Sequence, residues 1–416
     1  MSADKRGAEK KNGAENEILF RQRHMGSAVF VGWLVVVFTV QWMSLDIYLP
    51  AMPQIRDAFS VTEAQLNLTL SVYVIFCAVG TIVSGPLSDK YGRKRPILTG
   101  MVLFVLFNLL SAVSSSLASL IIFRSIAGLG SGAVCTIVMA MIKDSLAGRR
   151  FQQAMTFLQS LAIIGPILAP VAGAFIINWF SWRGIFIFLT IAAAASAIPL
   201  FLMDETLALE KRVEGNVWRA TCGLFTILKN KGFTLFLLVI SLLSASWYSY
   251  MAVCSYIYLE DFGLSYYMYS LYYGLGATAS FIAPFLYLYL SSKLRGRTIL
   301  QICFTMIFGS GLLIFLFGAK SSLAFFLFFL IFLLAEGMSR PLGMVILLDQ
   351  REDAIGAASS VSNFALSVLG VVGTSAATLP WNSYLSGLGI ILMVSIALSL
   401  IVWIPLLKTN VKIKGL

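Results

Sequence analysis

Twelve long apolar segments, separated by short polar stretches, constrain this chain more than any other feature of its sequence. A helix needs roughly 20 apolar residues to cross the hydrocarbon core of a bilayer. Of the 416 residues, 59% are hydrophobic and 12% are charged, which is about half the charged fraction of a typical soluble protein. The sequence therefore predicts an all-α integral membrane protein. We expect spans at 27–49, 65–87, 96–114, 118–141, 152–177, 184–203, 233–259, 266–290, 298–318, 321–345, 354–380 and 384–407.

The distribution of basic residues predicts which ends of the spans face the cytoplasm. With the N-terminus inside, 25 of the 30 Lys and Arg residues lie on the cytoplasmic side, which is a strong positive-inside bias. Arg56, Arg183 and Lys320 lie outside, and Arg124 and Arg340 fall within spans. We therefore expect both termini to be cytoplasmic. The net charge of +11 would then face anionic lipid, and no nucleic-acid partner is expected.

The chain divides into two similar halves around its longest internal hydrophilic stretch. Phe59 and Phe262 precede the second and eighth spans, and Lys90 and Lys293 follow them, each pair 203 residues apart. This common spacing indicates a duplicated unit, so we expect two pseudo-symmetric six-helix bundles around a central site. The predicted organisation is a cytoplasmic tail at 1–26, a first bundle at 27–203, a cytoplasmic loop at 204–231, a second bundle at 232–407 and a cytoplasmic tail at 408–416.

The sequence gives little support to metal or enzyme chemistry. The five cysteines are scattered, and the single histidine, His24, lies in the polar N-terminal tail, so the usual spacings assemble no metal cluster. A phosphate-binding Gly-rich loop with its Lys, an HExxH and a GxSxG are all missing from the sequence. We therefore expect no enzyme, no metal and no cofactor. An ion gradient would supply the energy, and a channel would not need a duplicated bundle.

The segment from Gly85 to Pro96, with the sequence GPLSDKYGRKRP, forms a predicted inner turn between the second and third spans. Four basic residues would hold this turn on the cytoplasmic side, a purpose for which the acid Asp89 is not needed. The segment resembles the inner-loop signature of the major facilitator superfamily. That resemblance implies the twelve-span major facilitator fold and a charge latch between the halves that involves Asp89 and Arg93. The alternative is a solvated loop that acts as a topology signal alone.

Four further segments resemble the Bcr/CflA group of drug:proton antiporters within that superfamily. They are Asp46–Pro53 at the end of the first span, Arg124–Gly128 in the fourth, Gly165–Gly173 in the fifth and Trp182–Phe186 at the start of the sixth. The resemblance implies gating by the small and kinked residues of the fifth-span motif, which are Gly165, Pro166, Pro170 and Gly173. Glycine permits close helix approach and proline breaks the helical hydrogen-bond ladder, and both serve a moving bundle.

Asp46 and Arg124 are the candidate proton-coupling pair on physical grounds as well. An ionisable residue within a span is costly and usually faces a cavity or a partner. Asp46 lies about twenty residues into an outward-running helix and Arg124 about seven into an inward-running one. At 1.5 Å per residue both fall in the outer half of the membrane, so we expect them to meet or to lie within a charge-coupling distance. The alternative is that Asp46 is an interfacial acid at the outer mouth.

The remaining candidate residues are expected to contact substrate. Glu336 and Arg340 stand at i and i+4 in the tenth span, where they form either a structural ion pair or a substrate contact. Aromatic rings in the seventh span could line a cavity and stack on an aromatic or cationic ligand. Five tyrosines between Tyr266 and Tyr273 begin the eighth span, and the aromatic residues nearest the external loop suit an interfacial belt. The candidate substrate-binding residues are Gln41, Trp42, Trp247, Tyr250, Tyr256, Glu336 and Arg340.

These observations predict a proton-coupled secondary transporter that works by alternating access. The family resemblance favours efflux of drugs or other small molecules from the bacterial cytoplasm across the inner membrane. The alternative of the same fold is a dedicated exporter or importer of one metabolite, such as a siderophore, an amino acid or a sugar-like solute. The expected partners are a small-molecule substrate, protons and the lipid bilayer, and we expect the chain to act as a monomer.

Overall fold

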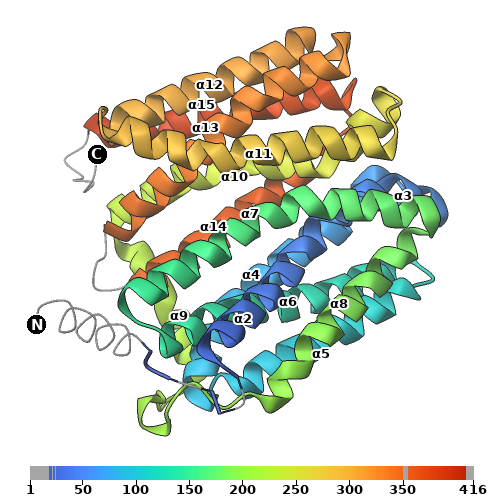
Figure 1. Cartoon of the computed structure of the whole chain (residues 1–416). Helices are drawn as coiled ribbons and strands as arrows, with labels where there is room; N and C mark the ends of the chain where they lie inside the picture. Colours follow the sequence, from blue (N-terminus) through green and yellow to red (C-terminus); the bar gives the residue numbers. More distant parts are fainter. Residues whose placement is uncertain (1–17, 21, 24, 350–354, 409–416) are drawn as a thin grey trace, which may run out of the picture.

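The computed structural model describes residues 18–20, 22–23, 25–349 and 355–408, and within these residues the chain is helical (Figure 1). His24 and most of the two expected tails lie outside the described residues. Eleven described helices are long and apolar enough to cross a membrane, and helix α7 adds a shorter apolar stretch at Leu168–Trp179. The chain is therefore a multi-pass membrane protein. The pairing of extended backbone is limited, in the described residues, to an isolated bridge between Ile18 and Leu146.

The twelve long helices agree with the predicted spans to within a few residues. The first half consists of α2 (Ser27–Asp46), α4 (Glu63–Tyr91), α5 (Lys94–Ala112), α6 (Leu117–Ser145), α7 (Gly148–Trp179) and α8 (Trp182–Leu202). The second half consists of α10 (Lys231–Tyr256), α11 (Tyr266–Ser291), α12 (Gly296–Phe317), α13 (Ser322–Asp349), α14 (Ile355–Ala377) and α15 (Tyr384–Lys408). Short helices connect them at η1 (Leu49–Ala51), α3 (Met52–Phe59), η2 (Leu209–Lys211), α9 (Val217–Leu224), η3 (Phe225–Lys229), η4 (Ile257–Asp261) and η5 (Gly318–Lys320).

The helix starts repeat at the spacing seen in the sequence. Helix α4 begins at Glu63 and α11 at Tyr266, 203 residues later. At both starts the hydroxyl of the N-cap residue accepts a hydrogen bond from a backbone N–H of the first turn. The N-cap residue is Thr62 in the first half and Ser265 in the second. Such caps satisfy the free N–H groups of a helix start. The equivalent helices of the two halves are therefore set by equivalent local signals.

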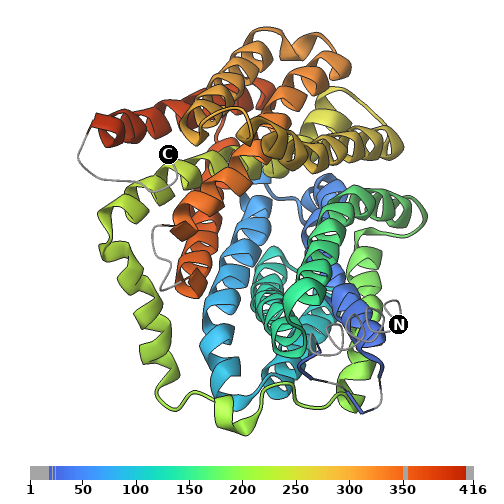
Figure 2. The same cartoon turned by 60° about the vertical axis from the view of Figure 1, so that its left-hand side comes forward.

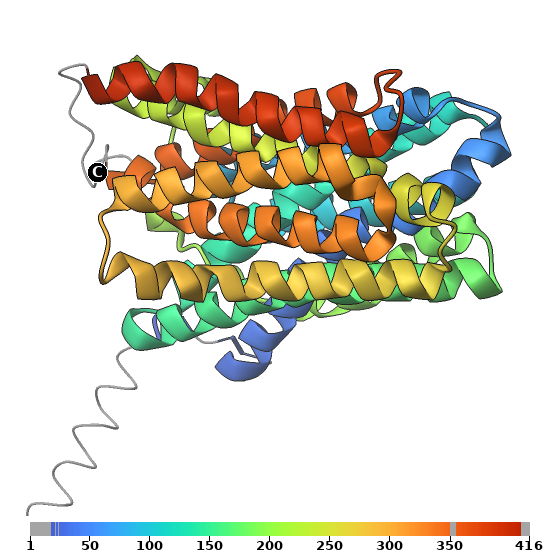
Figure 3. The same ribbon diagram turned by 90° about the horizontal axis from the view of Figure 1, so that it is seen from above.

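The helices pack as two groups that meet along two lines. Within the second half α12 and α15 lie side by side, as do α11 and α13 (Figure 3). Between the halves α7 packs against α11, and α4 packs against α14. The segment between α8 and α10 runs along one side of the molecule (Figure 2). We expected this segment to be a hydrophilic loop, but it contains the helix α9, which packs on α4 and α14.

The two ends of the bundle differ in how the halves meet. We call the end with the turns at 92–93, 146–147 and 292–295 the basic end, and the end with α3, η4 and η5 the Arg56 end; they lie at the left and right of Figure 1. At the Arg56 end, one hydrophobic core contains residues of both halves, from Ile47 to Ile55 in the first and from Tyr250 to Tyr258 in the second. At the basic end, the first half has a separate core of its own, from Phe30 to Met203. The halves are therefore closed against each other at the Arg56 end.

Candidate functional site

Asp46 lies at the interface between the halves. It is the last residue of α2 and is buried, with 4% of its surface exposed. The hydroxyl of Tyr273, on α11 of the second half, donates a hydrogen bond of 2.8 Å to Asp46 Oδ1. Tyr273 is also buried. The first-span acid is therefore bound by the opposite half of the protein.

Arg124 is enclosed within the first half. Its Nε donates to the carbonyl of Thr69 at 3.4 Å, and its Cζ lies 4.1 Å from the ring centroid of Tyr48 and 4.6 Å from that of Tyr73. Cation–π contacts of this kind stabilise a desolvated guanidinium. Both terminal nitrogens of Arg124 lack a hydrogen-bond partner among the described residues.

Asp46 and Arg124 were expected to meet or to lie within a charge-coupling distance. Among the described ion pairs, none within 4.0 Å joins these two side chains, so they do not meet, whereas coupling over a longer distance stays a prediction. Asp46 turns across the interface towards Tyr273, whereas Arg124 stays among the aromatic rings of its own half. Depth in the membrane placed both residues in the same layer, but it could not predict the directions in which their side chains point.

A row of aromatic rings continues from Tyr273 through the second half. Tyr250 stacks on Tyr273 with ring centroids 6.1 Å apart and on Phe329 at 3.9 Å. The Trp247 ring lies 6.1 Å from that of Tyr250, and Arg340 Cζ lies 5.6 Å from the Trp247 ring centroid. The structure thus brings the predicted residues Trp247, Tyr250 and Arg340 into one path that ends at Asp46.

Glu336 and Arg340 form an ion pair one helical turn apart on α13, as the spacing predicted. The Glu336 side chain is 6% exposed, whereas the Arg340 side chain is 53% exposed. A charged side chain that is this exposed within a span must meet water, a ligand or a lipid headgroup. Arg340 is therefore both half of a structural pair and free to contact a substrate.

Two predicted substrate contacts, Gln41 and Tyr256, have partners outside this path. Gln41 Nε2 faces Met101 Sδ of α5 at 3.6 Å within the first half. Trp42, one turn before Asp46 on α2, is 45% exposed. Tyr256 stacks on Tyr384 with ring centroids 5.7 Å apart, near the outermost layer of the Arg56 end. Tyr256 lies six residues beyond Tyr250, and this distance along α10 carries it out of the central region.

The fifth-span motif packs α7 tightly on both halves. The Pro170 carbonyl accepts a hydrogen bond of 3.1 Å from the Ser270 hydroxyl on α11. A Cβ atom added at Gly173 would lie 3.0 Å from Pro50 Cγ and closer still to the Ile47 carbonyl. Small residues allow such close helix approach. Gly165 and Pro166 lie within the same unbroken helix, and their side chains are outside the described part of the chain.

Arg56 links the halves at the outermost layer of the interface. Its Nη1 lies 2.9 Å from Glu260 Oε2 and its Nη2 2.9 Å from Glu260 Oε1, which is a two-pronged contact across the halves. The same guanidinium pairs with Asp57 and Glu63 of its own half. Arg56 also lies over the Tyr256 ring at 5.6 Å. Deeper contacts across the interface join Ser71 to Thr374 at 2.6 Å and Asn67 to the Ala252 carbonyl at 3.4 Å.

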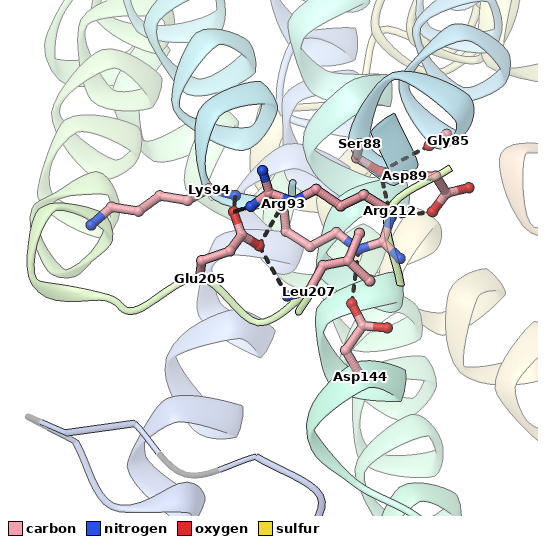
Figure 4. Close-up of polar contacts among 9 residues, drawn as sticks. All are labelled: Gly85, Ser88, Asp89, Arg93, Lys94, Asp144, Glu205, Leu207 and Arg212. Atoms are coloured by element: carbon pink, nitrogen blue, oxygen red, sulfur yellow. Dashed lines mark hydrogen bonds and ion pairs between the residues drawn. The ribbon is translucent and has the colours of Figure 1, made fainter. Parts of the chain in front are cut away.

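Arg93 organises the basic end of the first half (Figure 4). It donates to Asp89 Oδ1 at 2.5 Å, to the Ser88 hydroxyl at 2.7 Å and to Asp144 Oδ2 at 2.8 Å. Burial lowers the pKa of the Arg93 guanidinium and the carboxylates of Asp144 and Asp89 raise it, so that the pKa lies above its ordinary value. The turn before Arg93 requires glycine, because Gly92 has a φ of +89°.

The segment after α8 covers this cluster. Glu205 accepts hydrogen bonds from the backbone N–H groups of Arg93 at 2.8 Å and Lys94 at 3.2 Å, at the start of α5 (Figure 4). Val213 N–H donates to the Asp89 carbonyl at 3.0 Å. A cavity of about 230 Å³ lies between this segment and α4. We expected Asp89 and Arg93 to form a latch between the halves, but the contacts described here join the first half to the connecting segment.

Several residues of these contacts were not predicted to belong to a site, among them Tyr273, Glu260, Asp144 and Glu205. Asp144 and Glu205 each follow a span at the basic end, so their position among basic residues was a usable signal. Tyr273 stands one turn beyond Tyr269 on α11, which placed it deeper than an interfacial belt reaches. Glu260 gave no local signal, because its partner is 204 residues away in sequence.

Comparison with known proteins identifies the family. The sequence pattern of the Major Facilitator Superfamily matches residues 34–374. The chain therefore belongs to the Major Facilitator Superfamily, whose members are transporters and not enzymes. Among the described residues, no group of three or more His, Cys, Asp or Glu side chains could hold a metal ion.

Two bacterial relatives illustrate the similarity. The chain is 26% identical over 247 residues to the uncharacterized MFS-type transporter YdgK of Bacillus subtilis (strain 168), a match that covers 59% of this chain and 61% of YdgK. It is 31% identical over 163 residues to the multidrug resistance protein MdtL of Klebsiella pneumoniae (strain 342), over 39% of this chain and 42% of MdtL. The chain thus matches less than two thirds of the length of either relative.

Solved structures share the fold. The partially occluded inward-open form of the xylose transporter XylE from E. coli aligns with a TM-score of 0.69 at 15% identity, over 92% of this chain and 98% of XylE. A bacterial homologue of the human lysosomal transporter Spinster, inward-facing and unoccupied, aligns with a TM-score of 0.68 at 14% identity, over 91% of this chain and 95% of that one.

Proposed function

We propose that this protein is a proton-coupled antiporter that exports small drug-like molecules by alternating access. The observation that carries the proposal is the position of Asp46, a buried carboxylate of the first half bound by a hydroxyl of the second. An ionisable residue buried within a span is costly and is usually functional. A proton that binds there changes a contact between the halves, which is the link that coupled transport requires.

The arrangement of the halves supports an inward-facing state. If the basic end is cytoplasmic, as the positive-inside bias predicts, the closed Arg56 end faces outwards. There the halves share a hydrophobic core, whereas at the basic end the first half has a core of its own. The bundles 27–203 and 232–407, joined by the segment 204–231, would rock about Asp46 to expose each side in turn.

The central path supports an aromatic substrate. Arg340 presents an exposed guanidinium beside the face of Trp247, and such a pair can stack on a planar ring. The relative MdtL is named for multidrug resistance, which favours a drug-like compound over a single metabolite. Proton binding at Asp46 and substrate binding near Arg340 would alternate in the bacterial cytoplasmic membrane, within a single copy of the chain.

A flux assay tests this function. The purified full chain in proteoliposomes is given a pH gradient and a panel of planar aromatic compounds, cationic, neutral and anionic, with xylose as a non-aromatic solute. A dye in the lumen reports proton movement. We expect at least one aromatic compound to accumulate against its gradient, to move protons in the opposite direction and to stop when a protonophore is added. Accumulation that continues after the protonophore is added would overturn the proposal of proton coupling. Uptake of xylose alone would overturn the proposal that the substrate is drug-like.

A further inference from the structure

Tyr273 links the candidate proton site in the first half to the second half of the protein. Its hydroxyl donates to Asp46 across the interface, and both side chains are buried. Helix α11 begins at Tyr266. Tyr273 lies seven residues further along and is therefore about 10 Å deeper than the start of the helix. The hydrogen bond is thus at the inner limit of the closed Arg56 end, where the path towards Trp247 and Arg340 begins.

We infer that Tyr273 is a positioning residue whose hydrogen bond allows the Arg56 end to close while Asp46 is charged. This inference rests on the proposed function, in which Asp46 carries the proton. A hydroxyl that donates to a carboxylate makes a charge-assisted bond, which is roughly twice as strong as the same bond to a neutral acid. Burial in the closed state disfavours the charged carboxylate, and this bond offsets part of that cost. Without the bond, the ratio of closed to open protein at high pH should fall by about tenfold.

The surroundings of Tyr273 hold its hydroxyl on Asp46. Tyr250 stacks on one part of its ring, and Tyr269 lies against it with centroids 5.9 Å apart. The Tyr269 hydroxyl has a different partner, Cys254, at 3.5 Å. A ring packed between two others cannot turn to a new partner without moving them. A change in the charge of Asp46 is therefore felt by α11 as a whole.

Apart from Tyr273, the titratable groups near Asp46 form no hydrogen bond or ion pair with it among the described contacts. They are Tyr48, Tyr73 on α4, Tyr248, Tyr250 and Cys254 on α10, Arg124 on α6 and Arg183 on α8. Arg124 faces Tyr48 and Tyr73, and Arg183 donates to the Ser114 carbonyl at 3.1 Å. Helix α7, which also packs on α2, meets it at Gly173. Neither arginine forms an ion pair with Asp46 in the described structure.

A distance measurement between the halves tests the inference. Spin labels are placed on Ala58→Cys of α3 and Asn382→Cys before α15, both exposed at the Arg56 end, with the exposed Cys222 replaced by serine. The distance between the two labels is measured by pulsed electron paramagnetic resonance, from pH 5 to pH 9, on the full-length protein in lipid nanodiscs. In the parent protein we expect the closed population to rise as the pH falls, because closure buries Asp46 and burial favours its neutral form. Tyr273→Phe should reduce the closed-to-open ratio at high pH by about tenfold and so make its pH dependence steeper.

Matched variants separate the possible outcomes. Tyr269→Phe removes a buried hydroxyl one turn away and should keep the pH dependence. Asp46→Asn should remove it, and adding Tyr273→Phe to Asp46→Asn should change the ratio by less than about twofold. If Tyr273→Phe leaves both the high-pH ratio and the pH dependence as they are in the parent while Asp46→Asn removes that dependence, the inference fails and the proposed function stands. A parent protein whose closure does not respond to pH would overturn both.

Discussion

The outermost contact between the halves allows a quantitative prediction. Replacing Glu260 by glutamine leaves a side chain of the same shape but removes the charge that Arg56 binds across the interface at 2.9 Å. A charged hydrogen-bonded pair contributes about 1.5–3 kcal/mol and a neutral one about 1. Water reaches this pair, since 20% of the Arg56 and 34% of the Glu260 side chain are exposed, so we take the low end of the difference. Glu260→Gln should cost the closed state about 0.5 kcal/mol for each of the two bonds and about 1 kcal/mol in all, or roughly fivefold in the closed-to-open ratio.

The spin-label pair on α3 and before α15 measures that ratio directly. Asp57→Asn is the matched control, because Asp57 pairs with the same Arg56 from within the first half. Removing that charge leaves the contact across the halves in place, so the closed population should not decrease. If Glu260→Gln leaves the distance distribution unchanged, or if Asp57→Asn opens the protein equally, Arg56 does not hold the Arg56 end closed.

Three further predictions concern the basic end, the fifth-span motif and the topology. Asp144→Asn should lower thermal stability in detergent by about 1–2 kcal/mol. This loss should exceed that of Asp89→Asn, because the Asp144 side chain is 18% exposed and the Asp89 side chain 45%, and equal losses would contradict the shared Arg93 contact. Asp89→Asn should slow transport but leave substrate binding measurable. Gly173→Ala should lower stability by about 1–3 kcal/mol through overpacking, whereas Gly309→Ala, where a Cβ meets nothing within 4 Å, should not; two equal melting temperatures would refute the close approach of α7 to α2. Reporter fusions at Gly215 and after the last residue should both report the cytoplasm, and an external signal from either would overturn the predicted sidedness.

The sequence was sufficient to predict the spans because each depends on local composition. The predicted start at 266 is the observed start of α11, and the predicted start at 65 is two residues from the observed start of α4. The duplicated unit was also visible, because both halves carry the same kind of signal at the same spacing. Helix α9 was missed, since its eight residues are fewer than the roughly 11 to 18 over which helical periodicity is recognised.

The candidate site was predicted in its members but not in its contacts. Asp46, Trp247, Tyr250 and Arg340 were identified by residue type and depth, and the structure places them along one path. The link between them, Tyr273, stood in a run of tyrosines whose individual orientations depend on the rotation of α11. Partners that lie more than two hundred residues apart are chosen by the packing of the two halves, and a single sequence does not reveal that packing.

The most direct test of the account compares Asp46→Asn with Glu336→Gln in the proteoliposome flux assay. Asparagine keeps the shape of the protonated acid but cannot change its charge, so Asp46→Asn should abolish gradient-driven transport and substrate-induced proton release. Glu336 is paired with Arg340 on its own helix, so Glu336→Gln should alter substrate affinity and retain proton movement. If Asp46→Asn transports normally and Glu336→Gln does not, the proton is carried in the second half and the central assignment is wrong.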